Sequence, residues 1–205
     1  MQNNKALIVA AENNLNLSYY KNFYKIGVER GCLDLINKNM ILDLAVSDFD
    51  NVSKTEKNII EQKAKKFIQL DTEKDFLDGE IAIQNAIKNN CNEIIMIVKP
   101  TTRYDMNLSV FDFIFRYDVK IISENSISFK LEKGENILSF SKFQEFRYIS
   151  FFSKNNTTVT IKGLKFEINS FLLEPFSTRL ISNTFFENKD GCIFADNFLI
   201  CVISK

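Results

Sequence analysis

The chain has 205 residues, of which 45% are hydrophobic and 25% charged, so it is long enough and apolar enough to fold around a buried core. Its 26 Lys and Arg residues balance 26 Asp and Glu residues, and this zero net charge disfavours nucleic acid or an anionic membrane as a partner. There is no histidine, which excludes imidazole catalysis and histidine-ligated metals, so carboxylates must build any metal site and would favour a hard cation such as Mg²⁺.

The N-terminal region carries an apolar run of six residues, "ALIVAA", which is too short for a signal peptide and much too short to span a membrane. The four cysteines show no C-x-x-C spacing, and a chain of this length does not need disulfides, so we interpret them as reduced core residues. We therefore expect a soluble, cytoplasmic protein.

Up to about residue 122, short apolar runs alternate with longer amphipathic segments. The apolar runs predict strands at 6–11, 24–28, 41–46, 67–70 and 93–98, and the amphipathic segments predict helices at 30–39, 53–66, 75–90 and 105–117. Ser53 and Glu56 have the spacing of a capping box at the start of the second helix. This alternation is typical of βαβ units and predicts a mostly parallel sheet flanked by helices.

After Val119 the helical pattern stops. Strand-like segments separated by Gly- and Asn-containing turns lie at 119–141, 146–152, 157–168, 183–188 and 191–204. They predict a small antiparallel β-sandwich. The predicted fold class is thus α/β followed by all-β, with one domain over 1–123 and a second over 124–205.

Acidic residues follow the third predicted strand in the stretch "SDFDN". Side chains alternate along an extended segment, so Asp48 and Asp50 should face one side while Phe49 anchors in the core on the other. Ligands bind beyond the carboxyl ends of the strands in open parallel sheets, and this stretch is expected there. Aspartates are also common in such loops as turn formers and helix caps.

Two further loops at the same predicted sheet edge carry charged residues. Asp75 and Asp78 would share one face of a first helical turn if the helix begins near Lys74, although acids there also complement the helix dipole. Arg103 and Asp105 follow the fifth predicted strand, where they could bind phosphate or form a surface ion pair. Several carboxylates and one arginine at one edge suit Mg²⁺–nucleotide chemistry.

Five motifs stand in order along the chain: "SDFDN" (47–51), "KDFLDGE" (74–80), "TTRYDM" (101–106), "GLKF" (163–166) and "SNT" (182–184). They resemble the thiamine pyrophosphokinase family. Its pattern runs Gly-Asp-Phe-Asp-Ser, Lys-Asp-x-Thr-Asp-x-Glu, Gly-Gly-Arg-x-Asp-His, Gly-Leu-Lys with an aromatic, and Ser-Asn. The order and approximate spacing hold over residues 24–205.

The resemblance implies Mg²⁺-dependent transfer of pyrophosphate from ATP to the hydroxyl of thiamine, giving thiamine diphosphate and AMP. It makes 1–123 the catalytic, nucleotide- and magnesium-binding domain and 124–205 the thiamine-binding domain of a homodimer. The implied catalytic residues are Asp48, Asp50, Asp75, Asp78, Arg103 and Asp105, of which Asp48, Asp50 and Asp78 would hold the metal. The implied nucleotide contacts are Glu29, Gly31, Lys74 and Arg103, and the implied thiamine contacts are Phe166, Ser182 and Asn183.

The chain also departs from the family pattern, and those departures that replace glycine add side chains near the expected phosphate site. The departures are Ser47 and Asn51 in the first motif, Leu77 in the second, Thr101, Thr102 and Met106 in the third, and Glu29 in place of an upstream aspartate. Two alternatives to the enzyme therefore stay open. One is a degenerate module that binds thiamine or a nucleotide without turnover, and the other is a related Mg²⁺-dependent transferase that uses another alcohol.

Overall fold

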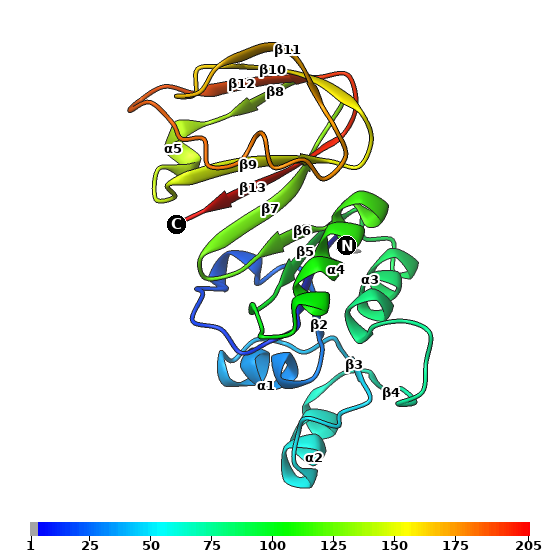
Figure 1. Ribbon diagram of the computed structural model, residues 1–205. Coiled ribbons are helices and arrows are strands. Elements are labelled where there is room, and N and C mark those ends of the chain that lie inside the picture. Colours follow the sequence, from blue (N-terminus) through cyan, green and yellow to red (C-terminus); the bar gives the residue numbers. More distant parts are fainter. Residues whose placement is uncertain (1–3) are drawn as a thin grey trace. The chain divides into compact units, whose positions relative to one another are not determined.

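The chain separates into two units, which the computed structural model describes over residues 4–205. The first unit ends at Glu124, and the second covers Asn125–Lys205. In Figure 1 the first unit runs from blue to green and the second from green to red. No helix among the described residues is both long and apolar enough to cross a membrane.

The first unit is a parallel sheet flanked by helices, as predicted. The strands are β1 (Lys5–Val9), β2 (Tyr24–Gly27), β3 (Leu44–Ser47), β4 (Phe67–Gln69), β5 (Glu93–Ile97) and β6 (Lys120–Ile122), and they pair in parallel in the order β4-β3-β2-β1-β5-β6. The helices are α1 (Arg30–Asn37), α2 (Lys54–Lys63), α3 (Asp78–Lys88), α4 (Tyr104–Tyr117) and the short 3₁₀ turn η1 (Ser18–Tyr20). Because the strands are parallel, the loops that follow them emerge at one edge of the sheet.

A buried apolar cluster joins this sheet to its helices. Leu7 and Val9 of β1, Leu35 of α1 and Ile60 of α2 are all fully buried and belong to it. Their spacing explains the pattern in the sequence, since strand residues alternate between faces while helix residues recur every three or four positions. The cluster fixes α1 and α2 against the sheet, and so fixes the loops that lead into them.

The predicted capping box at the start of α2 is confirmed. The Ser53 side chain accepts a hydrogen bond from the Glu56 backbone N–H at 3.2 Å, and the Glu56 carboxylate accepts one from the Ser53 N–H at 2.8 Å. The start predicted for the next helix is wrong, because α3 begins at Asp78 and residues 71–77 are irregular. Asp75 and Asp78 therefore do not share a helical turn.

Phe49 is buried as predicted, but the extended geometry expected around it is wrong. β3 ends at Ser47, and the Phe49 backbone adopts a left-handed conformation with φ of 58°. The ring is 4% exposed and stacks on Phe67 of β4, with centroids 4.7 Å apart and planes 14° from parallel. Burial and stacking offset the cost of a left-handed non-glycine residue, about 1–2 kcal/mol.

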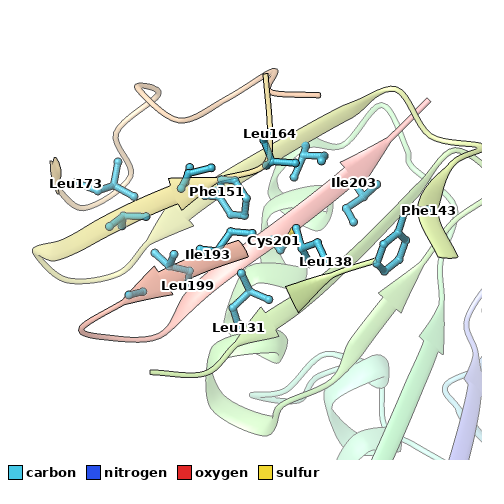
Figure 2. Close-up of a cluster of buried hydrophobic side chains, with 14 residues drawn as sticks. Leu131, Leu138, Phe143, Phe151, Leu164, Leu173, Ile193, Leu199, Cys201 and Ile203 are labelled. Atoms are coloured by element: carbon cyan, nitrogen blue, oxygen red, sulfur yellow. The ribbon is translucent and has the colours of Figure 1, made fainter. Parts of the chain in front are cut away.

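The second unit is an antiparallel β-sandwich, which confirms the predicted fold class. One layer has the order β7-β13-β9 and the other the order β11-β10-β12-β8. The strands are β7 (Ser126–Leu131), β8 (Gly134–Leu138), β9 (Tyr148–Ser153), β10 (Thr157–Lys162), β11 (Ile168–Leu173), β12 (Gly191–Ala195) and β13 (Leu199–Ser204), with a short helix α5 (Phe140–Phe143). The buried side chains of both layers meet in one core, in which Phe151 and Ile193 are fully buried (Figure 2).

Several boundaries in this unit differ from the prediction. The segment predicted as one strand over 157–168 is interrupted at Gly163, which has φ of 78° and turns the chain after β10. Residues 183–188 contain only isolated bridges at Asn183 and Phe185 instead of a strand. The helix α5 was not predicted, because a helix of one turn carries too little periodicity to stand out.

Candidate active site

Glu29 reaches toward β3 from the start of α1. It is the N-cap of that helix, yet its φ of 49° and ψ of −129° turn the side chain away from capping. The carboxylate instead accepts a hydrogen bond from the Ser47 hydroxyl at 2.5 Å and one from the Asn51 backbone N–H at 3.2 Å. A non-glycine residue with positive φ is strained, and such strain is concentrated at functional sites.

Ser47 joins two carboxylates at the end of β3. Its side chain is fully buried, and its hydroxyl contacts both Glu29 and Oδ2 of Asp78. A hydroxyl carries one proton, so it can donate to only one of these carboxylates at a time. The backbone N–H of Asp48 also donates to Oδ2 of Asp78, at 3.4 Å. Asp78 thereby docks the first turn of α3 against the end of β3.

The result is a compact group of three acids, Glu29, Asp48 and Asp78. One carboxylate oxygen from each lies within 4.8 Å of the others. Burial is the main effect that raises the pKa of Glu29, and the nearby acids Asp48 and Asp50 raise it further, against the hydrogen bonds from Ser47 and Asn51. An arrangement of like charges at this spacing suits a divalent cation, which prefers oxygen ligands.

Lys74 places its amino group between two of these acids. Nζ lies 2.9 Å from Oδ2 of Asp48 and 2.9 Å from Oδ1 of Asp78, and it donates to the Asp71 carbonyl at 2.9 Å. Burial acts to raise the pKa of Asp48, but the hydrogen bond and charge of Lys74 outweigh it and the net pKa is lowered. Burial likewise acts to lower the pKa of Lys74, and its two acidic partners reverse this, so the pKa is raised.

Oδ1 of Asp78 is buried and accepts no hydrogen bond from the part of the chain that the structure describes. Lys74 approaches this oxygen to 2.9 Å as an ion pair. A buried carboxylate oxygen with an unused lone pair is available to a cation, so the residues present fit a magnesium ion.

Two of the predicted acids lie outside this group of three. Asp50 is exposed, and its carboxylate accepts a hydrogen bond from the Asn51 side chain. Asp75 is exposed on the irregular segment 71–77. The structure thus brings Asp48 and Asp78 together as predicted, with Glu29 as the third member where the prediction had Asp50.

Arg103 and Asp105 lie in the loop after β5 and at the start of α4. Their side chains form an ion pair with Nη2 and Oδ2 2.5 Å apart, and both are more than half exposed. The hydrogen bond with Arg103 lowers the pKa of Asp105. Asn107 shapes the loop, since its side chain accepts from the Thr101 N–H at 2.9 Å and donates to the Thr101 carbonyl at 2.7 Å.

Gly31 permits a close approach between α1 and β1. A Cβ atom added at this position would lie 1.9 Å from the Val9 carbonyl oxygen, which no side chain tolerates. The first turn of α1 therefore lies directly on the end of β1, at the same sheet edge as the acids, and its Gly31 and Cys32 N–H groups donate to the Val28 and Glu29 carbonyls at 2.9 and 3.0 Å. Such a helix start favours anions.

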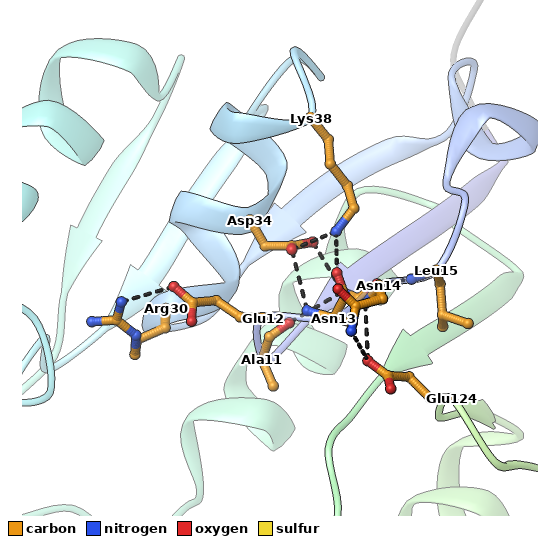
Figure 3. A network of polar contacts seen from close by, with 9 residues as sticks. All are labelled: Ala11, Glu12, Asn13, Asn14, Leu15, Arg30, Asp34, Lys38 and Glu124. Atoms are coloured by element: carbon orange, nitrogen blue, oxygen red, sulfur yellow. Dashed lines mark hydrogen bonds and ion pairs between the residues drawn. The ribbon is translucent and has the colours of Figure 1, made fainter.

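A network of polar side chains fastens the segment after β1 onto α1 (Figure 3). Buried Asn13 donates from its side chain to buried Asp34 at 2.9 Å, and Asp34 also pairs with Lys38. At the start of the same helix, Arg30 lies 2.7 Å from Glu12. This network holds the loop after β1 beside the start of α1.

In the second unit, Phe166 presents its ring to solvent while its backbone is held. The ring is 58% exposed, and Asn183, which is 5% exposed, bonds to both the N–H and the carbonyl of Phe166 at 3.0 Å and 2.9 Å. Ser182 is exposed in a left-handed conformation with φ of 60°. The predicted aromatic platform is accessible, whereas the Asn183 amide is already occupied by backbone groups.

Comparison with known proteins assigns both units to one family. Residues 15–124 match the family described as "Thiamin pyrophosphokinase, catalytic domain", and residues 126–199 match "Thiamin pyrophosphokinase, vitamin B1 binding domain". The chain belongs to the thiamin pyrophosphokinase family. The resemblance drawn from the five motifs is confirmed, and so is the predicted enzyme class, the thiamine diphosphokinases.

Individual members of the family support this assignment. The thiamine pyrophosphokinase of Bacillus subtilis (strain 168) is 26% identical over 186 residues, which cover 87% of this chain and 86% of the relative. Among solved structures, a thiamin pyrophosphokinase family protein from Enterococcus faecalis has a TM-score of 0.85 at 24% identity, covering 98% of this chain and 99% of its own. The thiamin pyrophosphokinase from Candida albicans has a TM-score of 0.79 at 16% identity, with coverage of 98% and 89%, and so shares the fold.

The thiamin pyrophosphokinase motifs did not predict the contacts that two residues, Ser47 and Lys74, make with the acidic group. Ser47 entered the sequence comparison only as a departure from glycine, yet its hydroxyl bridges Glu29 and Asp78. The pairing of Lys74 with Asp48 was also missed, although the four-residue spacing of Lys74 and Asp78 is a signal that could have indicated one of its two contacts.

Proposed function

We propose that this chain is a thiamine pyrophosphokinase, which transfers the terminal diphosphate of ATP to the hydroxyl of thiamine and yields thiamine diphosphate and AMP. The observation that carries the proposal is the group Glu29, Asp48 and Asp78 at the carboxyl edge of the parallel sheet, in the unit that matches the family's catalytic domain. In the reaction, the hydroxyl oxygen of thiamine bonds to the β-phosphorus and its proton passes to solvent. The bond from that phosphorus to the α–β bridging oxygen breaks, and AMP leaves with that oxygen.

Glu29, Asp48 and Asp78 would hold Mg²⁺, with Asp50 beside them. Support comes from one carboxylate oxygen of each residue, since these three oxygens lie within 4.8 Å of one another, and from the buried Oδ1 of Asp78, which accepts no hydrogen bond from residues 4–205. When bound, the ion supplies neutralisation of phosphate charge as the diphosphate is transferred. Phosphoryl-type transfer depends on positioning and charge neutralisation, so the lack of histidine does not oppose this chemistry.

The remaining predicted residues of the first unit would orient ATP. Lys74 and Arg103 carry positive charges that can contact its phosphates, and Asp105 holds the Arg103 guanidinium through their ion pair. Asp75 lies on the same irregular segment as Lys74 and would add a carboxylate close to it. Gly31 lets the start of α1 lie against the end of β1, beside the acids, where the positive end of the helix dipole would favour the phosphates.

The second unit would bind thiamine. The exposed Phe166 ring can stack on a flat heterocycle, and the positive thiazolium of thiamine is attracted to an aromatic face. Ser182 is exposed and can donate to the substrate, while Asn183 would act by holding Phe166 in place. We propose that thiamine binds at this surface.

We also propose that the protein acts as a cytoplasmic homodimer. The outer face of the β11-β10-β12-β8 layer carries large apolar side chains that are more than half exposed, namely Ile137, Leu172 and Phe194. Such a patch is commonly covered by another protein surface. Light scattering at working concentration should give the mass of two chains, and a monomer would contradict this part of the proposal.

The direct test is AMP release from ATP and Mg²⁺ with and without thiamine. We expect thiamine-dependent AMP, and loss of that activity in Asp48→Asn and Asp78→Asn with the fold intact by circular dichroism. Asp112→Asn is the control, because it removes an acid of an exposed ion pair on α4. Full activity in both site variants would reject the proposal.

Two other functions predict different results in the same assay. Thr101 and Thr102 stand where the family pattern has glycines, which favours a module that binds without turnover; that module would bind thiamine in calorimetry and release no AMP. A transferase for another alcohol would release AMP faster with a competing acceptor than with thiamine. Thiamine-dependent AMP as the preferred reaction rejects both.

A further inference from the structure

Lys74 occupies an all-oxygen position between two fixed acids. Its ammonium lies 2.9 Å from an oxygen of Asp48, 2.9 Å from an oxygen of Asp78 and 2.9 Å from the Asp71 carbonyl oxygen. Its side chain is 18% exposed, and those of Asp48 and Asp78 are 14% and 16% exposed, so water screens these contacts little. Two carboxylates and a carbonyl are also the oxygen ligands that a hard cation takes.

We propose that Lys74 is an internal competitor for the metal position, which its ammonium fills in the free protein and leaves when a divalent cation binds. The inference rests on the proposed role of the acidic group in holding Mg²⁺. It adds that the Lys74 ammonium lowers the affinity of the site for the metal. Once the metal is bound, this ammonium is free to contact the phosphates of ATP.

The elements that carry these residues support a movement of the lysine rather than of the acids. Asp48 directly follows β3, and Asp78 is the first residue of α3, so both are attached to regular elements. Lys74 lies within the irregular segment 71–77, which belongs to no helix or strand. Withdrawal of Lys74 therefore breaks two ion pairs and one hydrogen bond to a carbonyl, and no backbone hydrogen bonds of a helix or sheet.

The charges favour the same exchange. Glu29, Asp48 and Asp78 each place one carboxyl oxygen within 4.8 Å of the others, and one ammonium among three acids leaves the group under-neutralised. A divalent cation neutralises the group more fully than a lysine, but it must compete for the Asp48 and Asp78 oxygens that Lys74 already contacts. Removing the lysine charge should therefore strengthen metal binding, whereas removing a metal ligand would weaken it.

The first experiment is calorimetric titration of the nucleotide-free protein with Mg²⁺, using wild type, Lys74→Met and Lys65→Met. Lys65→Met is the matched control, because it removes a lysine that pairs with Asp43 at 2.7 Å near the amino ends of β3 and β4. We expect Lys74→Met to bind Mg²⁺ about tenfold more tightly than wild type. The control should bind like wild type.

The second experiment uses only wild-type protein, so it can be carried out even if Lys74→Met folds poorly. Wild-type protein is labelled briefly with an amine-reactive reagent, and the modification of Lys74 is quantified by mass spectrometry. We expect Mg²⁺ alone to increase the labelling of Lys74, and further addition of an uncleavable ATP analogue to decrease it again. Labelling of Lys65 should stay constant throughout.

The outcomes separate this inference from the proposed function. Unchanged or weaker Mg²⁺ binding by Lys74→Met, or Lys74 labelling that Mg²⁺ leaves unchanged or reduces, overturns the inference while the enzyme activity can still stand. Absence of Mg²⁺ binding in wild type and both variants overturns the metal site and this inference with it. Tighter binding in Lys74→Met together with increased labelling supports the exchange.

Discussion

The side-chain amide of Asn183 holds the backbone of Phe166 from both sides. Oδ1 accepts from the Phe166 N–H at 3.0 Å and Nδ2 donates to the Phe166 carbonyl at 2.9 Å, as a neighbouring strand would. The amide is buried, whereas the ring that it positions is 58% exposed. A buried residue thus determines where an exposed aromatic surface stands.

The first prediction concerns this pair. Asn183→Ala should raise the KM for thiamine about tenfold, equivalent to ~1.4 kcal/mol, with a smaller effect on kcat, because the ring loses its fixed position. It should also lower the free energy of unfolding by about 1–3 kcal/mol, since the Phe166 backbone groups lose their partner. Steady-state kinetics and urea unfolding measure the two effects.

Phe166→Ala provides the comparison for that variant. It should raise the KM for thiamine with little loss of stability, because the ring is exposed. If Asn183 acts through Phe166, the double variant should have the KM of Phe166→Ala alone. Additive effects on KM would show instead that Asn183 contributes independently.

The second prediction concerns the buried hydroxyl of Ser47. Ser47→Ala removes the donor that Glu29 and Asp78 share, so the metal-free protein should lose about 1–2 kcal/mol of unfolding free energy. Saturating Mg²⁺ should reduce this loss, because a cation can take over neutralisation of the two acids. Urea unfolding with Mg²⁺ and with a chelator makes the comparison.

Ser153→Ala is the control for this experiment. Ser153 is equally buried, but it lies in the second unit, where its hydroxyl donates to the Glu174 carbonyl at 3.4 Å. Its effect on stability should therefore be the same with and without Mg²⁺. The prediction for Ser47 fails if its variant behaves in that same way.

The third prediction concerns pH. Lys74 lowers the folded-state pKa of Asp48, so their pairing stabilises the fold above the unfolded pKa of an aspartate, about 3.9, and the stabilisation is lost as pH falls through the lowered folded value. In a chelator, Lys74→Met should therefore be less stable than wild type by about 1 kcal/mol at pH 7. Urea unfolding at pH 7 and in a series below pH 4 measures this difference, which should shrink in the acid range; a difference independent of pH would contradict the prediction.

The fourth prediction concerns Phe49, the buried residue that follows Asp48. Phe49→Ala should lower the free energy of unfolding by about 3–5 kcal/mol, because it empties a buried position and removes the stacking on Phe67. Phe49→Leu keeps most of the buried volume and should cost about half as much. Denaturant unfolding of both variants, with wild type alongside, measures this; equal losses for Ala and Leu would show that packing does not hold the loop.

Much of the fold could be predicted because it depends on local patterns. The alternation of apolar runs and amphipathic segments located the strands and helices of the first unit, and the spacing of Ser53 and Glu56 located the start of α2. The burial of Phe49 followed from its apolar character, but its left-handed backbone did not, since bulky residues rarely adopt that conformation. The start of α3 at Asp78 was missed because Leu77, the N-cap, forms no side-chain cap that a sequence could reveal.

The site was predictable only in part, for a related reason. The motifs identified Asp48 and Asp78, whose meeting follows from the parallel sheet. The place of Glu29 in the group depends on its unusual backbone angles, and the bridging by Ser47 depends on a hydroxyl at a position where the family pattern has glycine. Contacts of this kind are set by tertiary geometry, so residue types and spacing alone do not specify them.

Gly31 carries a consequence for mutagenesis. Since any side chain there would collide with the end of β1, a library randomised at this codon should return glycine from a screen for folded protein alone, with no requirement for catalysis. Position 74 should behave in the opposite way. A folding screen should accept many residues there, and lysine should be required only when turnover is selected. If Gly31 persists among the selected variants, the reason is therefore the packing of a helix against a strand. If Lys74 persists, the reason is its role in turnover.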